Sequence, residues 1–270
     1  MFDDREHAMF EPVSLDPQSL HPYDQAHGLR RLFAAQRQRQ VVLVHNPFVK
    51  GASALLQRLT SVYAARGLHT LMVDAADTAA APHELARIDL SACVDRLSEK
   101  VSFLAARGLP MRHVDARGTT SAFLDAVASA CPQADVVLLH ASASDLTRLY
   151  AGRELRPVLL AGSRTESLTD AYASMKLLAQ RLGVSGCDLI ISAEAGWPHA
   201  GLLAERLDSC ARRFLGTPLH DWAVIDPAGL QPGLDFERLA LGLLSDEDPL
   251  ATPPAAAARA PRAPQARYAN

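Results

Sequence analysis

The turn that follows the apolar run VVLVH, at residues 41–45, is the first candidate for chemistry. It reads HNPFVKGAS and contains Lys50, Gly51 and Ser53, which are residue types found in phosphate-binding loops. Such a loop aims backbone N–H groups at phosphate oxygens, a lysine adds positive charge, and a Ser or Thr holds magnesium. Here, however, Pro47 has no N–H group, and the lysine stands two positions before the place that the motif requires. The turn therefore predicts a degenerate nucleotide site.

Two further strand ends lie where a nucleotide site would place its magnesium-binding acids. Asp74 and Asp77 follow the run TLMV, and their carboxylates could hold magnesium or orient a water molecule. The run DVVLLH, in contrast, ends in His140, where a magnesium-binding aspartate would be expected. Because the turn and this position both lack the required group, we expect neither bound ATP and Mg²⁺ nor ATP hydrolysis. The alternative is a working ATPase with an unorthodox loop.

A zinc site is a second alternative for the same edge of the protein. His45, Asp74, Asp115 and His140 all end predicted strands, and two imidazoles with two carboxylates can bind zinc. Strand-end residues of these types often coincide in parallel sheets, so we expect no metal site. The cysteines are also far apart and have no ligand spacing, which predicts reduced, buried thiols. They are Cys93, Cys131, Cys187 and Cys210.

The elements that must position these residues are short apolar strands alternating with amphipathic helices. Near-continuous apolar strands are typical of a parallel sheet covered on both faces. The alternation therefore predicts an α/β fold with a doubly wound, mostly parallel sheet of about seven strands, as in P-loop NTPases. The predicted strands are 41–45, 70–74, 111–115, 135–140, 156–162, 187–193 and 222–226. The predicted helices are 52–67, 119–131 and 167–183.

Composition divides the chain into five parts. Its last part is rich in Pro and Ala and cannot bury enough apolar surface to offset its chain entropy, which predicts disorder. The parts are a mobile arm (1–22), a helical arm (23–40), the α/β domain (41–230), an amphipathic helix (231–249) and a disordered tail (250–270).

Charge and hydropathy exclude several classes of protein. The net charge of −3 gives no basic field for nucleic acid. The acidic N-terminus lacks the apolar core of a signal peptide, and no apolar run approaches the roughly 20 residues of a membrane span. We therefore expect a soluble intracellular protein.

The order of elements resembles the deviant-Walker ATPases of the MinD/ParA type, and within them the bacterial flagellar-number regulators of the FlhG type. The resemblance rests on GLHTLMVDA, ADVVLL and TESLTDAYASMKLLAQRLG, and above all on YDQAHGLRRLF at residues 23–33. These regulators carry a DQAxxLR motif ahead of the first strand. The residues that match it are Asp24, Gln25, Ala26, Leu29 and Arg30.

The resemblance implies a role for this arm. It implies that the arm docks on the flagellar signal-recognition-type GTPase (FlhF type) and stimulates its GTP hydrolysis, which limits flagellar number and placement. Gln25 would approach the partner's catalytic site, and Asp24 and Arg30 would orient the helix. Leu29 and Phe33 would give the arm an apolar face. The resemblance also implies a cytoplasmic protein recruited to the cell pole or flagellar base.

Departures from the family pattern affect its ATPase parts. Counted back from Asp74, Ala52 falls on the phosphate-loop lysine and Ser53 on the magnesium ligand, while Ala76 replaces the second acid of the DxD pair. ATP-driven dimerisation is lost with ATP, so we expect a monomeric pseudo-ATPase. A scaffold that binds a flagellar transcription activator or a basal-body protein remains a further alternative.

The segment LDFERLALGLL corresponds to the family's membrane-targeting helix. Its apolar stripe includes Phe236 and Leu239, but its polar face is mostly acidic, unlike the basic face that anionic lipid attracts. We therefore expect this helix to dock on the domain, with weak or no membrane association.

Overall fold

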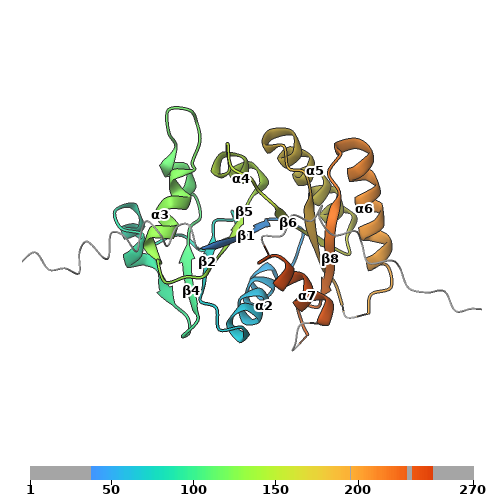
Figure 1. The fold of residues 1–270 in the computed structure, drawn as a ribbon, viewed down its shortest axis with the longest axis horizontal. Helices are drawn as coiled ribbons and strands as arrows, with labels where there is room; N and C mark the ends of the chain where they lie inside the picture. Colours follow the sequence, from blue (N-terminus) through green and yellow to red (C-terminus); the bar gives the residue numbers. More distant parts are fainter. Residues whose placement is uncertain (1–37, 195, 230–232, 246–270) are drawn as a thin grey trace, which may run out of the picture.

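The computed structural model describes residues 38–194, 196–229 and 233–245. Within them, an eight-stranded sheet has the order β3-β4-β2-β5-β1-β6-β7-β8 (Figure 1). Every neighbouring pair is parallel except β3 and β4. The strands are β1 (Arg39–Val44), β2 (Thr70–Asp74), β3 (Asp95–Arg96), β4 (Val101–Ala105), β5 (Val136–Ala141), β6 (Pro157–Gly162), β7 (Cys187–Ser192) and β8 (Leu219–Ile225).

Helices follow most of the parallel strands. The α-helices are α2 (Ala52–Ala65), α3 (Ala122–Ala130), α4 (Ala143–Leu149), α5 (Thr165–Leu182), α6 (Ala200–Leu215) and α7 (Leu234–Gly242). Three 3₁₀ turns, η1 (Glu84–Arg87), η2 (Ser91–Cys93) and η3 (Pro110–His113), lie in the segment between β2 and α3. The doubly wound, mostly parallel α/β sheet predicted from the sequence is therefore confirmed.

One predicted strand is wrong. Residues 111–115 were expected to form a strand, but most of that run belongs to η3, which begins at Pro110. The strand in this part of the sheet is instead β4, whose burial alternates along VSFLA because it lies near the edge of the sheet. Asp115 consequently does not end a strand: it lies in an exposed turn and accepts hydrogen bonds from the backbone and hydroxyl of Thr119.

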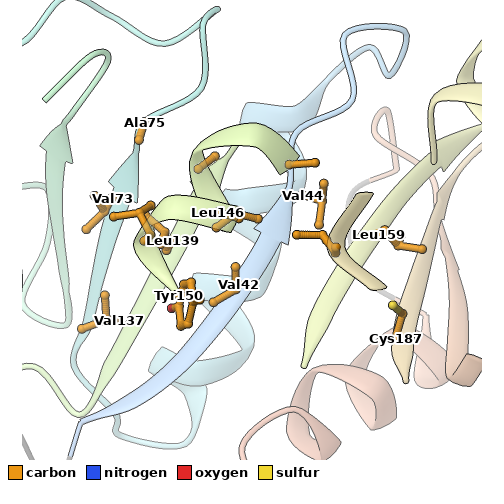
Figure 2. Close-up of a cluster of buried hydrophobic side chains, with 14 of the residues drawn as sticks. Val42, Val44, Val73, Ala75, Val137, Leu139, Leu146, Tyr150, Leu159 and Cys187 are labelled. Carbon is orange, nitrogen blue, oxygen red and sulfur yellow. The ribbon is translucent and has the colours of Figure 1, made fainter. Parts of the chain in front are cut away.

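The sheet separates two apolar cores. Side chains of β1 alternate between them, with Val42 and Val44 in one core and Val41 and Leu43 in the other. Helices α3, α4, α5 and α6 cover the first face, and α2 and α7 cover the second (Figure 1). Figure 2 shows the first core, where the β1 valines lie near Tyr150 and other apolar side chains. This packing fixes the position of β1 and of the turn that follows it.

Helix α7 docks on the second face, as predicted for the amphipathic segment. Phe236 and Leu239 are fully buried in the core that α2 and β8 also line. The apolar stripe of α7 is therefore covered by the protein itself. Among the described helices, none combines the length and the apolar content that crossing a bilayer requires.

Candidate functional site

The turn between β1 and α2 has the position and length of a phosphate loop. Strand β1 ends at Val44 and α2 begins at Ala52, directly after Gly51. Gly51 caps the helix in the left-handed region, with φ of +80°. Ala52 therefore occupies the first turn of the helix, where the motif would place its lysine, and Ser53 occupies the next position.

The buried Asn46 side chain connects this turn to the rest of the domain by hydrogen bonds. Its side chain is 2% exposed, and its Nδ2 donates to the carbonyl oxygens of Leu160 at 2.7 Å and Ser167 at 2.8 Å. Leu160 lies in β6 and Ser167 in α5, so one amide connects the end of β1 to the neighbouring strand and helix. Buried polar groups with this many partners are costly to remove, which fixes the first residues of the turn.

Asn46 also accepts hydrogen bonds from two backbone N–H groups that a phosphate loop would direct at its ligand. Asn46 Oδ1 accepts the N–H of Phe48 at 3.0 Å, and its carbonyl oxygen accepts the N–H of Val49 at 3.1 Å. Pro47, which precedes them, has no N–H group. Positions 47 to 49 therefore offer no free donor, whereas a phosphate loop works through consecutive free N–H groups.

The chain also contacts the turn from its C-terminal half. A Cβ atom on Gly51 would lie 3.0 Å from Cβ of Pro227, in the turn after β8. The carbonyl oxygen of Lys50 accepts a hydrogen bond from Ser192 Oγ, at the end of β7, at 3.5 Å. Arg58 of α2 donates to the carbonyl oxygen of Gly229. These contacts connect the end of the turn and helix α2 to the end of β7 and to the segment that follows β8. Position 51 needs glycine because its φ is positive and because a side chain there would contact Pro227.

A hydrogen-bonded chain of three side chains stands where magnesium chemistry was expected. His140 Nδ1 lies 2.9 Å from Asp74 Oδ1, and His140 Nε2 lies 3.2 Å from His45 Nδ1. His140 is 2% exposed and Asp74 is 15% exposed. A carboxylate can only accept, so it takes the Nδ1–H of His140, and the Nε2 of neutral His140 then accepts the Nδ1–H of His45.

Burial and the neighbouring imidazole lower the pKa of His45. Desolvation is the larger cause and His140 the second, while the carboxylates of Asp74 and Asp77 oppose the shift. Asp74 Oδ1 also accepts the N–H of Ala76 at 3.3 Å. The Asp74 carboxylate thus orients an imidazole and a backbone turn, and His140 supplies no carboxylate for magnesium.

The structure brings together only part of the predicted zinc set. His45, His140 and Asp74 meet at the carboxyl edge of β1, β5 and β2, but Asp115 lies elsewhere, in its exposed turn. Among the described residues, no group of three or more potential ligands could hold a metal ion. The convergent side chains bond to one another instead.

Sequence reasoning missed Asn46, although it noted the poor fit of the turn around it. The available signal was a polar residue directly after an apolar strand, at a position that the phosphate-loop motif gives to glycine. The remaining predicted nucleotide residues, Lys50, Ser53 and Asp77, are exposed around this site. The predicted partner-binding residues Asp24, Gln25, Ala26, Leu29, Arg30 and Phe33 lie outside the described residues.

No protein-family model matches the chain, and no curated protein matches it in sequence. Solved structures of MinD/ParA-family P-loop ATPases are similar to it. A plasmid partition protein from Borrelia burgdorferi has a TM-score of 0.50 and 11% identity, covering 77% of this chain and 97% of that chain. MinD from Aquifex aeolicus has a TM-score of 0.49 and 12% identity, covering 75% and 86%.

A third similar structure is the McdA–ATP complex of Cyanothece, with a TM-score of 0.49 and 10% identity, covering 77% of this chain and 88% of that chain. At such identities the likeness shows the fold alone. The chain shares its α/β fold with the plasmid partition protein from Borrelia burgdorferi.

Replacing Gly51 by Ala should cost more stability than replacing another left-handed glycine. Gly216 has φ of +68°, and a Cβ atom added to it would meet nothing within 4 Å, so Gly216→Ala measures the backbone cost alone. That cost is about 1–2 kcal/mol, and Gly51→Ala should exceed it because Pro227 is in contact. Urea denaturation of both variants checks the difference, and Pro227→Gly should remove it in a double-mutant cycle. Equal losses would contradict the contact.

Stability should fall as the pH drops below the ordinary His pKa of 6.5, and His45 should account for part of the fall. Its folded-state pKa is lowered, so the unfolded chain takes up a proton on this residue that the folded protein does not, and acidification favours unfolding. In His45→Gln, the urea midpoint should change less between about pH 7.5 and about pH 5.5 than in the parent. An unchanged pH dependence would contradict the assignment.

Proposed function

We propose that this chain is a MinD/ParA-like protein without ATPase activity that regulates flagellar number and placement. It binds an FlhF-type GTPase through residues 23–33 and stimulates that partner's GTP hydrolysis. The observation that carries the proposal is the DQAHGLR sequence ahead of β1, combined with a loop after β1 whose positions 47 to 49 offer no donor to a phosphate.

The residues at the nucleotide-binding positions support the proposed absence of ATPase activity. The backbone donors at the start of the turn are bonded to Asn46, and the lysine position is Ala52. The acid that would follow β5 is His140, which is bonded to Asp74. Without the donors at positions 47 to 49, the lysine and the acid, the phosphate charge and the magnesium ion would lack most of their usual partners.

The second half rests on what a glutamine can do in a partner's active site. An amide both donates and accepts hydrogen bonds, so Gln25 can orient an attacking water without adding charge. The leucine and phenylalanine of the arm, Leu29 and Phe33, lie four residues apart, which places them on one face of a helix. That face gives the arm an apolar side for docking while the glutamine reaches the reacting phosphate.

In this account the α/β domain keeps its fold and has lost its chemistry. Apolar cores fill both faces of its sheet, and Phe236 and Leu239 of the C-terminal helix are buried in one of them. A stable domain with an inert edge can still present the arm and limit where it acts.

The variant Gln25→Ala should abolish GTPase stimulation without unfolding the protein. Loss of a residue that orients the attacking water should lower the stimulated rate by roughly two orders of magnitude. The measurement is steady-state GTP turnover of an FlhF-type GTPase with saturating amounts of each variant. Gln36→Ala, in the same arm but outside the DQAHGLR motif, is the matched control.

Binding of the two proteins should be measured beside turnover. Gln25→Ala should still bind the GTPase, whereas Leu29→Asp should bind it weakly because its apolar face is broken. Equal stimulation by the parent and by Gln25→Ala would contradict the role of the glutamine. No stimulation by the parent would contradict the proposed function.

A further inference from the structure

A groove of about 780 Å³ lies between the segment that joins η1 to η2 and helix α3. Ile88 and Asp89 line one wall, and Asp125, Ala126 and Ala130 line the other. None of the residues that line the groove belongs to the turn after β1, and α3 packs against η2 and η3.

Ile88 gives this groove an unusual apolar surface. It is 86% exposed, more than any other large apolar side chain among the described residues. Leu85, in η1 just before it, is also exposed, at 49%. Single exposed apolar residues are common, but one that lines a groove of this size offers a contact to something that fills the groove.

The chain enters the described structure beside this groove. Gln38 is the first described residue, and its Nε2 donates to the carbonyl oxygen of Cys131 at 2.9 Å. Cys131 lies between Ala130 and Pro132, which both line the groove. The segment 23–37 therefore joins the described structure at Gln38, which contacts a residue next to the groove lining. Fifteen residues of helix would span about 22 Å at 1.5 Å per residue, so the segment can reach along the groove.

The chemistry of residues 23–37 matches that of the groove. In a helix Leu29, Leu32 and Phe33 share one face, because they are spaced i, i+3 and i+4. The same segment contains three arginines and one acid, as its sequence YDQAHGLRRLFAAQR shows.

The groove supplies both apolar contact and negative charge. Ile88, Ala126 and Ala130 are the apolar partners. Asp89 and Asp125 carry negative charge, and Arg87 and His113 also line the groove. The Ser91 side chain and backbone donate to Asp89 and lower its pKa, which keeps that carboxylate charged. Asp125 is two-thirds exposed, so its existing pair with Arg153 leaves room for a second cation.

We propose that this groove binds residues 23–37 of the same chain. The apolar face of the arm packs on Ile88 and α3, and its arginines face Asp89 and Asp125. The consequence for regulation rests on the proposed function: the face that would dock on the GTPase is the face held in the groove. A partner must then compete with the groove for the arm, and the groove sets how much of the arm is available.

The test is hydrogen–deuterium exchange of the full-length protein. The amides of residues 23–37 should be protected in the parent, and Ile88→Glu should speed their exchange by roughly tenfold or more, because one buried aliphatic contact is replaced by a charge. Leu234→Glu is the matched control, since Leu234 is 84% exposed and belongs to α7, which covers the opposite face of the sheet. The reciprocal variant Phe33→Asp should speed exchange of the groove wall at residues 86–91.

Three results would overturn the proposal. The first is unprotected exchange of residues 23–37 in the parent protein. The second is equal exchange in Ile88→Glu and Leu234→Glu. The third is protection that grows with protein concentration, which would place the arm in a second copy of the chain. None of these measurements involves the GTPase, so a failure of the proposed function leaves this test intact. If both hold, Ile88→Glu should also lower the amount of protein needed for half-maximal GTPase stimulation.

Discussion

The three hydrogen bonds of the Asn46 side chain fix the conformation of the turn after β1, at the carboxyl edge of the sheet. Two of them hold the carbonyl oxygens of β6 and α5, and the third holds the N–H of Phe48. In a phosphate loop this position is a glycine, and the backbone around it stays free to surround an anion. Here a buried amide takes that place, so the turn is bonded to its own side chain and to its neighbours. The loop keeps its length but has no free N–H donor at positions 47 to 49.

The His45–His140–Asp74 chain is a second set of side-chain hydrogen bonds at the same edge. A magnesium-binding edge needs carboxylates that face solvent and metal, whereas here the partly buried carboxylate of Asp74 is bonded to an imidazole. Such a chain connects the ends of β1, β5 and β2 without any ligand. The edge that binds nucleotide in a P-loop fold is thus held together here by side-chain hydrogen bonds.

The two halves of the account meet at the N-terminal arm. If the α/β domain does no chemistry, its useful properties are its surfaces and the position from which it presents residues 23–37. In our proposals, the groove near Gln38 binds that arm on its own domain, and an FlhF-type GTPase competes with the groove for it. Regulation then becomes a balance between two binding events of one short segment, which a change of a few residues on either surface can shift.

Much of the fold follows from local sequence. The near-continuous apolar runs predict β1, β2, β5, β6 and β7 because a strand buried on both faces needs few polar positions. β4 is missed because its half-buried VSFLA alternates, and the more polar run at residues 111–115 is mistaken for it. The loss of the lysine and the acid is also visible in sequence, since it needs only residue identity.

The rest depends on distant contacts: the partners of Asn46 lie 114 and 121 residues further along the chain, so no local pattern identifies its bonds. Convergence of His45, His140 and Asp74 at one edge follows from parallel strands, but the error at residues 111–115 added Asp115 to that group. The groove near α3 depends on how η1 and η2 fold against it, and short 3₁₀ turns leave little periodicity to read.

Thermal unfolding in the presence of Mg·ATP tests the central claim most directly. A ligand that binds only the folded state stabilises it by about 2.7 kcal/mol at a hundredfold excess over its Kd, so even modest binding raises the Tm. The account predicts the same Tm with and without millimolar Mg·ATP, for the parent and for Lys50→Ala alike. A saturable, magnesium-dependent rise in the parent that Lys50→Ala removes would show that the turn after β1 binds triphosphate, and would contradict the account.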